Sequence, residues 1–310
     1  MMRRGLFAIS WTVALAWFNG ASCGSAAETF TIGTYNVEMY LDYPALQHEV
    51  KSEDSRAKVR ESIKQMAADV LAIEEMGSTN ALAELQTSLR HEGLNYRYSA
   101  HVDGYDTNLH VALLSKFPIL SQKSHTDDKF LLHGRRFKVT RGFGEFEIEV
   151  NPDYRFTILA AHLKSKRLLA EADESEMREQ EALLLREHVD DIFARNRNVN
   201  LVVMGDLNDT KDSRSIRSII GKGQTALIDT RPAEQHSDEL TGNGRNTVRL
   251  VTWTHHFAKE DTYSRIDYIL LSKSMARGWQ PGDSRVIVVP NWGIASDHRP
   301  IAAQFISHDR

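Results

Sequence analysis

Two polar side chains follow an apolar run of strand length near the middle of the sequence. Leu201–Met204 is apolar, Gly205 interrupts it, and Asp206 and Asn208 follow two positions apart. In an extended chain, residues two apart point to the same side. We therefore expect both side chains to face one space at the end of a buried strand. A carboxylate there can orient a water molecule and an amide can hydrogen-bond a phosphate oxygen, which indicates metal-assisted hydrolysis of a phosphoester.

Further polar side chains stand at the ends of other predicted strands. Each position alone is a weak signal, because an acid or an amide there is often a turn former or a helix cap. Open α/β sheets place their ligands at strand ends, so several such positions in one chain predict a shared site. The positions are Asn36, Glu74, Glu75, His162, Lys164, Asp267, Asp297 and His298.

Short apolar runs alternate with longer helical patterns along the chain, which predicts one α/β domain with buried strands. The segment from Phe137 to Val150 alternates apolar and polar residues around two glycines and predicts a hairpin. The predicted helices are Arg56–Ala67, Ala81–Glu92, Glu174–Ala194 and Ser213–Ile220. The predicted strands are Thr29–Thr34, Val70–Ile73, His110–Leu114, Phe156–Ala160, Leu201–Met204, Ile266–Leu271, Val286–Val289 and Ile301–Phe305.

The order and spacing of these motifs resemble the endonuclease/exonuclease/phosphatase superfamily, which includes pancreatic-type deoxyribonucleases, apurinic/apyrimidinic endonucleases, neutral sphingomyelinases and inositol polyphosphate 5-phosphatases. The resemblance implies a four-layer α/β/β/α sandwich, in which two mixed sheets pack together with helices outside. Only AIEEM departs from the pattern, with Glu74 where the family often has glutamine. The matching pieces are TYNVE at 34–38, AIEEM at 72–76, VALLSKFPI at 111–119, AHLKS at 161–165, GDLND at 205–209, RIDYIL at 265–270 and SDHRP at 296–300.

The resemblance also implies a Mg²⁺ or Mn²⁺ site. It places Glu75 on the metal, with Asn36 near it and Asp297 close by, directly or through water. Such hard cations prefer oxygen ligands. Glu74 is the competing ligand, but alternation along a strand turns neighbouring side chains apart, and we favour Glu75.

The remaining motif residues take catalytic roles by the same resemblance. Asp206 orients or deprotonates the attacking water, and Asn208 holds a phosphate oxygen. His298 binds the charge that develops on phosphorus, while Asp267 holds the other nitrogen of its ring. His162 matches a histidine of the deoxyribonuclease and sphingomyelinase branches, where it stabilises charge or protonates the leaving oxygen. The pair His255 and His256 is expected to be structural, because neighbours in a strand diverge.

Two basic clusters contrast with the overall acidity of the chain, whose formal net charge is −4 and whose pI is about 6.4. They are either an ordinary solvated face or a groove that follows a phosphate backbone. The clusters are Arg135, Arg136, Lys138 and Arg141, and then Lys164, Lys166 and Arg167. The expected substrate-binding residues are Arg141, Lys164, Lys166 and Arg167.

The N-terminus has the pattern of a signal peptide. Arg3 and Arg4 precede an uncharged apolar stretch that is too short to span a membrane comfortably, and a small-residue cleavage pattern ends at Ala27. We therefore expect a signal peptide over residues 1–27, a single catalytic domain over 28–310, and a secreted or periplasmic protein. The only cysteine, Cys23, lies inside this segment, so the mature chain has no disulfide. Lipid anchoring at Cys23 is the alternative.

These expectations combine into a divalent-metal-dependent phosphodiesterase, with DNA or RNA as the expected substrate. The first alternative is a phosphomonoesterase or a sphingomyelinase-like lipid phosphodiesterase, because fold alone does not choose a substrate. The second is a non-catalytic binding protein on the same scaffold, which the complete set of site residues argues against. No stable protein partner and no transmembrane segment are inferred, and a monomer is expected.

Overall fold

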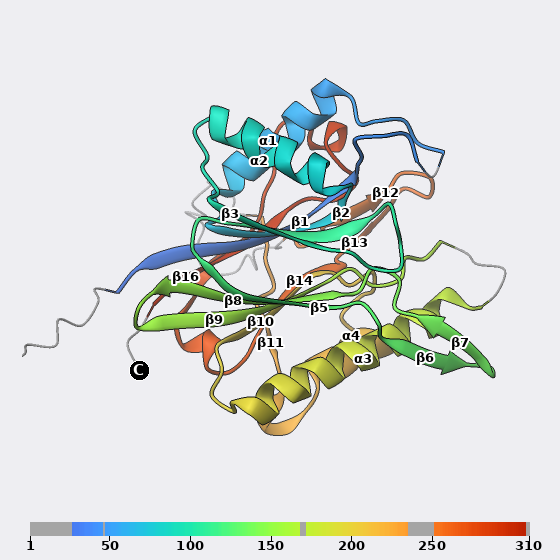
Figure 1. Ribbon diagram of the computed structural model, residues 1–310, viewed down its shortest axis with the longest axis vertical. Helices are drawn as coiled ribbons and strands as arrows, with labels where there is room; N and C mark the ends of the chain where they lie inside the picture. The colour runs from blue at the N-terminus through green and yellow to red at the C-terminus, as the bar shows by residue number, and fades with distance from the viewer. Residues whose placement is uncertain (1–26, 46, 168–171, 235–250, 308–310) are drawn as a thin grey trace, which may run out of the picture.

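A computed structural model describes residues 27–45, 47–167, 172–234 and 251–307 (Figure 1). The expected signal peptide and Cys23 fall within residues 1–26 and lie outside the described residues. No helix in the described part of the chain is long and apolar enough to cross a membrane.

Two six-stranded mixed sheets form the two inner layers of the molecule. Each has one parallel pair at its centre, β1 with β2 and β9 with β10, and antiparallel neighbours outside it. In spatial order, the first sheet contains β15 (Trp279–Val286), β16 (Ile301–Ile306), β1 (Thr29–Tyr40), β2 (Val70–Met76), β4 (His110–Ser115) and β3 (Tyr98–Val102). The second contains β11 (Ile228–Asp229), β14 (Asp267–Leu271), β10 (Leu201–Asp206), β9 (Tyr154–Ala161), β8 (Phe143–Asn151) and β5 (Ile119–His125).

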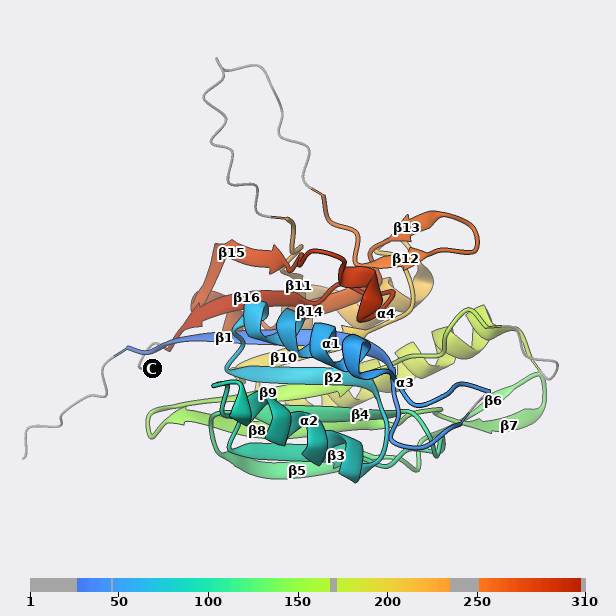
Figure 2. The same cartoon turned by 90° about the horizontal axis from the view of Figure 1, so that it is seen from above.

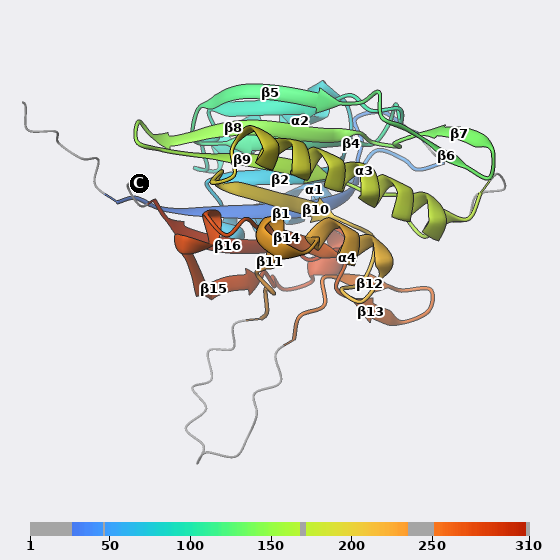
Figure 3. The same ribbon diagram turned by 90° about the horizontal axis from the view of Figure 1, so that it is seen from below.

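Helices cover the outer face of each sheet. Helices α1 (Glu53–Met66) and α2 (Thr79–His91) lie over the first sheet (Figure 2), and α3 (Glu174–Arg195) and α4 (Arg214–Ile220) lie over the second (Figure 3). Each helix begins just after a residue whose side-chain oxygen accepts a hydrogen bond from a free backbone N–H in the first turn. The N-caps are Ser52, Ser78, Asp173 and Ser213. The described residues thus confirm the four-layer sandwich.

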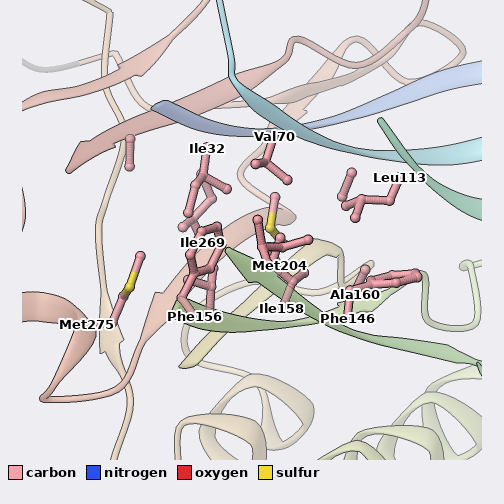
Figure 4. Close-up of a cluster of buried hydrophobic side chains, with 14 of the residues drawn as sticks. Ile32, Val70, Leu113, Phe146, Phe156, Ile158, Ala160, Met204, Ile269 and Met275 are labelled. Atoms are coloured by element: carbon pink, nitrogen blue, oxygen red, sulfur yellow. The ribbon is translucent and has the colours of Figure 1, made fainter. Parts of the chain in front are cut away.

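The main core lies between the two sheets (Figure 4). Ile32 and Val70 of the first sheet face Ile158 and Met204 of the second, and all four side chains are fully buried. Two further apolar clusters fill the spaces between each sheet and its helices. Because strands packed on both faces need apolar residues throughout, the continuous apolar runs of the sequence are explained. This three-part core holds the strand ends in fixed positions.

Two sequence predictions were wrong in detail. The segment 137–150 is not one hairpin: it holds the end of β7 (Arg135–Lys138), which pairs with β6 (Lys129–Leu132), and most of β8, which pairs with β5 and β9. Gly142, with φ +71°, turns the chain between them. The strand predicted at 286–289 lies earlier in the chain, as β15, because ladder pairing with β16 ends at Val286.

The β6–β7 hairpin projects from the sandwich beside the first turns of α3 (Figures 1 and 3). His133 at its tip contacts Glu176 with an Nε2–Oε2 distance of 2.6 Å, and Asp128 at its base contacts His188 with an Oδ2–Nε2 distance of 2.6 Å. A second small ribbon joins β12 (His255–Phe257) and β13 (Thr262–Ser264) at the same end of the molecule. Short 3₁₀ turns occupy Gly223–Thr225, Met275–Arg277 and Trp292–Ile294.

Candidate active site

The polar strand ends meet at one edge of the sandwich. The parallel strands β1, β2, β9 and β10 end there, while the antiparallel strands β14 and β16 begin there. Two ladder pairs bring predicted site residues together directly: Asn36 stands opposite Glu74, and Asp206 stands opposite Asp267. The strand arrangement therefore collects residues from six separate segments of the sequence.

Asp206 lies at the centre of this cluster and is fully buried. Its Oδ2 accepts hydrogen bonds from the side-chain amides of Asn36 at 3.0 Å and Asn208 at 3.2 Å, while Oδ1 accepts from the backbone N–H of Asn208 at 2.9 Å. The Nε2 atom of His162 lies 3.4 Å from Oδ2. Burial raises the pKa of Asp206, and the charge of Asp267 raises it further against the opposing effect of His298. Asp206 is thus a rigidly held carboxylate with more than ordinary basicity.

Asn208 meets Asp206 through a turn and not through extended chain. Its φ is +53°, a left-handed conformation that asparagine tolerates better than most residues. Its side-chain amide donates to Asp206 and to the carbonyl of Leu163 at 3.0 Å. Both amide hydrogens are therefore used within the protein, so the structure favours a role for Asn208 in positioning Asp206 over direct contact with a phosphate.

His298 forms a second carboxylate–imidazole unit. Its Nδ1 lies 3.0 Å from Oδ2 of Asp267, and Thr254 donates its hydroxyl to the same carboxylate at 2.5 Å. Burial opposes a charge on His298, but Asp267 and Asp206 outweigh it, and the pKa of His298 lies well above its usual range. Its Nε2 points toward Asp206 at 3.7 Å. A cationic ring beside the reaction space can stabilise negative charge on a phosphoryl group. Arg265, two residues before Asp267, pairs with Asp229 at 2.6 Å and not with Asp267.

Adjacent glutamates on β2 point in different directions. Glu74 is fully buried, and its Oε1 accepts a hydrogen bond from Thr34 at 2.7 Å. Burial raises its pKa well above the usual range, which favours the neutral form and a structural role. Glu75 has φ +59° and turns toward the open edge, where its carboxylate accepts from Asn36 at 3.3 Å and from the backbone N–H of Met39 at 3.1 Å. This geometry favours Glu75 as the metal ligand.

His162 is fully enclosed, yet neither ring nitrogen makes a hydrogen bond to any described residue. Its Nε2 faces both Asp206, at 3.4 Å, and Glu75, at 3.9 Å. Burial lowers the pKa of His162 far below its usual value, with Arg141 adding to the effect. A neutral ring can donate one N–H to a developing charge but is a poor proton donor. This favours stabilisation of charge over protonation of the leaving oxygen as the role of His162.

The structure adds two residues that the sequence reasoning did not place in the site. Glu38 lies near Asp297 and Glu75, and burial, followed by the charge of Asp297, raises its pKa to about 7. The Nε2 of His255 lies 3.4 Å from Oδ2 of Asp297, and its ring centroid lies 4.6 Å from that of His298. Glu38 was visible within the TYNVE motif. The sequence did not indicate that His255 lies near Asp297 and His298, because this proximity depends on an isolated bridge between His255 and His298.

A groove of about 940 Å³ leads away from Glu75 toward the β6–β7 hairpin and the start of α3. The side chains of Tyr105 and Phe137 contribute aromatic surface to it. Lys166, expected at the substrate, is exposed but does not line the groove. Lys129, which was not among the expected substrate-binding residues, lines the groove. The basic residues that line the groove are Lys129, Arg136, Lys138, Arg141, Lys164 and Arg167.

Comparison with known proteins agrees with the fold and the motifs. The model of the endonuclease/exonuclease/phosphatase family matches residues 33–298, so the chain belongs to this family. No curated protein matches its sequence significantly.

Solved structures are similar to this chain at low sequence identity. They include truncated TDP2 from Caenorhabditis elegans (14% identity, TM-score 0.58, covering 90% of this chain and 98% of that one). The human nocturnin catalytic domain with bound sulfate has 15% identity and a TM-score of 0.60, covering 89% and 94%. Sphingomyelinase C from Streptomyces griseocarneus has 18% identity and a TM-score of 0.58, covering 90% and 99%. At these identities the likeness establishes the fold alone.

Members of this family are metal-dependent hydrolases of phosphoester bonds, and the donor set at the strand ends fits a divalent cation. Glu75 presents a partly exposed carboxylate, with Asp297 and Glu38 nearby as further oxygen donors. Buried His162 has two ring nitrogens without hydrogen-bond partners among the described residues, and it lies beside this carboxylate. Oxygen-rich ligand sets of this kind suit Mg²⁺ or Mn²⁺.

Gly205 is required for Asp206 to reach its position. Its φ is +133°, and an added Cβ would lie 2.0 Å from the carbonyl oxygen of Ala161. We expect Gly205→Ala to lower the free energy of unfolding by about 3 kcal/mol or more, measured by urea denaturation. Gly93→Ala is the matched control, because Gly93 also has positive φ (+91°) but nothing lies within 4 Å of its added Cβ. Equal losses of unfolding free energy in the two variants would show that backbone strain, and not the close approach to Ala161, is the reason for glycine at position 205.

Proposed function

We propose that this chain is a divalent-metal-dependent phosphodiesterase that hydrolyses polynucleotides. The observation that carries the proposal is the basic groove beside Glu75. Of the residues that line it, six are basic and two, Glu75 and Asp106, are acidic. The chain as a whole has a formal net charge of −4, so this concentration of positive charge is local. A long polyanion engages many such charges at once, whereas a small phosphoester engages few.

Each site residue would have its own role in the hydrolysis of a phosphodiester. Asp206 holds the attacking water and accepts its proton as the water oxygen bonds to phosphorus. Cationic His298 and the N–H of neutral His162 stabilise the negative charge on the phosphoryl oxygens and on the oxygen that leaves. Glu75, Asn36 and Asp297 would hold the divalent cation. When bound, that cation offsets the phosphoryl charge that repels the nucleophile.

Aromatic side chains next to the cations also support a nucleic acid as substrate. Lys138 Nζ lies 5.3 Å from the ring centroid of Tyr105, which is 64% exposed, and Phe137 faces the same groove. Exposed rings flanked by positive charge are typical of sites where bases stack while phosphates are neutralised. A lipid phosphodiesterase would need a larger apolar surface. On the hairpin, Leu131 is exposed, but it stands opposite Arg136 in the β6–β7 ladder and two residues after Lys129 on the same strand.

The test compares long and short substrates across a salt series. Plasmid DNA, RNA, sphingomyelin and a small chromogenic phosphodiester are assayed with Mg²⁺. We expect hydrolysis of DNA or RNA to fall steeply with salt while hydrolysis of the small diester changes little. The triple variant Lys129→Gln, Arg136→Gln and Lys138→Gln should raise KM for the polynucleotide roughly tenfold or more. It should also reduce the slope of log affinity against log salt by as much as about three.

The matched control replaces three exposed basic residues that do not line the groove, Arg90, Lys123 and Lys222, by glutamine. This variant has the same net charge as the groove variant, and we expect its salt slope to equal that of the wild type. Equal slopes in both triple variants would show that the groove does not bind the polyanion. Preferred hydrolysis of sphingomyelin would replace the nuclease proposal with the lipid phosphodiesterase alternative.

A further inference from the structure

Two histidines and an aspartate converge outside the candidate active site, where the loop 103–109 joins β3 to β4. His101 lies on β3, Asp103 directly follows β3, and His110 begins β4. One potential ligand atom from each residue lies within 4.8 Å of the others. The two imidazole rings are 4.4 Å apart between centroids, and each histidine side chain is 8% exposed, whereas that of Asp103 is 81% exposed. The ring nitrogens are therefore shielded, and the carboxylate lies at the solvent boundary.

Hydrogen bonding fixes the tautomer of a neutral His101. Its Nε2 lies 2.9 Å from the carbonyl oxygen of Gly77, which can only accept, so Nε2 carries the hydrogen. Nδ1 then presents a lone pair, and that lone pair faces Oδ1 of Asp103 at 2.9 Å without a hydrogen bond. Two lone pairs so close repel each other unless a proton or a metal ion lies between them. A metal-binding histidine commonly donates its other N–H to a backbone carbonyl in this way.

His110 completes the cluster from the other side. Its Nδ1 lies 3.8 Å from Oδ1 of Asp103 and 3.2 Å from the carbonyl oxygen of Val102. Burial lowers the pKa of His110, and the neighbouring ring of His101 lowers it further. To bind a metal through Nδ1, the neutral ring must carry its hydrogen on Nε2, so metal binding would replace the contact between Nδ1 and the Val102 carbonyl.

The spacing of these atoms fits one ion. Ligands bound tetrahedrally to Zn²⁺ at about 2.0–2.1 Å lie about 3.3 Å apart, and the observed separations of 2.9 and 3.8 Å lie on either side of this value. Two imidazoles and a carboxylate favour Zn²⁺ over Mg²⁺ or Ca²⁺, which prefer all-oxygen ligands. We propose that His101, Asp103 and His110 form a zinc site, distinct from the phosphoesterase centre, with water as the fourth ligand.

The loop that carries Asp103 is held in place without the ion. Gly104 packs against the backbone of Arg141, where an added Cβ would lie 2.3 Å from its carbonyl oxygen. Asp106 donates its backbone N–H to the carbonyl of Thr140 at 2.7 Å, and its side chain accepts from the backbone N–H of Asn108 at 3.0 Å. The same loop supplies Tyr105, Asp106 and Leu109 to the groove. A bound zinc ion would add one more link between this wall of the groove and strands β3 and β4.

The experiment measures zinc binding and thermal stability, and does not depend on activity. The purified protein is stripped with a chelator, returned to excess Mg²⁺ to occupy the oxygen-ligand site, and titrated with Zn²⁺ by calorimetry. Bound zinc is then counted by mass spectrometry after dialysis. We expect one zinc ion per wild-type chain and a rise in Tm of roughly 4–6 °C at a hundredfold excess over Kd. Asp103→Ala should lose both, and it should fold because Asp103 is exposed.

Two further variants make the assignment specific. His101→Gln keeps an N–H donor toward Gly77 but lacks the Nδ1 ligand, so it should also lose the zinc ion. His255→Ala removes one of the two histidines of a second possible metal cluster, formed by His255, Asp297 and His298, and should retain the zinc ion. Zinc lost in His255→Ala but kept in Asp103→Ala would overturn the proposal. A wild-type chain that binds no zinc would also overturn it and assign the 2.9 Å contact to a protonated His101.

Discussion

Asp206→Asn is expected to lower kcat/KM for a phosphodiester on the order of 10²–10⁴-fold in the presence of Mg²⁺. Burial raises the pKa of the Asp206 carboxyl group and makes it a better base, whereas an amide cannot accept the proton of the attacking water. His298→Ala should cause a loss of the same order, because the ring whose charge is supported by Asp267 is removed. Initial rates on a small chromogenic diester measure both effects without involving the basic groove.

The two residues should act as one unit, because Nε2 of His298 lies 3.7 Å from Oδ2 of Asp206. The double variant should therefore lose much less than the product of the two single losses. Asp212→Asn is the control, since this exposed aspartate follows the same strand but lies on the surface. Urea denaturation of each variant separates lost catalysis from lost folding. Near wild-type rates for both single variants would place the reaction elsewhere.

The meeting of the polar strand ends at one edge of the sandwich was predictable from the sequence. Apolar runs identified the strands, and parallel pairing brings their carboxyl ends to one edge. This logic placed Asn36, Asp206 and Asp267 together: Asp206 stands opposite Asp267 in the ladder and accepts a hydrogen bond from the Asn36 side chain at 3.0 Å. The alternation of side chains along a strand also predicted that Glu74 and Glu75 point in different directions. The positive φ of Glu75 and Asn208 was not predictable, because a left-handed residue other than glycine leaves little trace in sequence.

Most of the other failures concern contacts between segments that are distant in the sequence. His255 reaches Asp297 only because an isolated bridge joins two segments that are distant in the sequence. The segment 137–150 has the alternation of a hairpin, but β6 competes successfully for β7, and β9 pairs with β8. Lys164 was expected at the substrate. It lines the groove, but its Nζ donates to the carbonyls of Ser165 and Arg167 at 3.0 Å, so part of its role is to shape this turn.

Glu75→Gln should weaken the binding of the catalytic metal and lower activity at moderate Mg²⁺, with partial recovery at high Mg²⁺. Asn36 and Met39 donate to different oxygens of Glu75, so the glutamine would keep only one of these hydrogen bonds and would lose the negative charge that attracts a divalent cation. A cation at this point is worth several kcal/mol in the transition state. Activity of the wild type should disappear in excess chelator and return with Mg²⁺ or Mn²⁺. The measurement is the Mg²⁺ concentration that gives half-maximal rate.

Glu74→Gln is the matched control for this prediction, because the two glutamates are adjacent and only one can be the ligand. Burial raises the pKa of Glu74 well above its usual range, which favours the protonated form, and glutamine closely resembles that form in shape and charge. We expect Glu74→Gln to leave the half-maximal Mg²⁺ concentration unchanged, whereas Glu75→Gln should raise it at least tenfold, which corresponds to about 1.4 kcal/mol of lost binding. If only Glu74→Gln raised the half-maximal Mg²⁺ concentration, Glu74 would be the metal ligand in place of Glu75. Full wild-type activity in excess chelator would remove the metal from the mechanism and leave Asp206 and His298 to act on the phosphodiester without it.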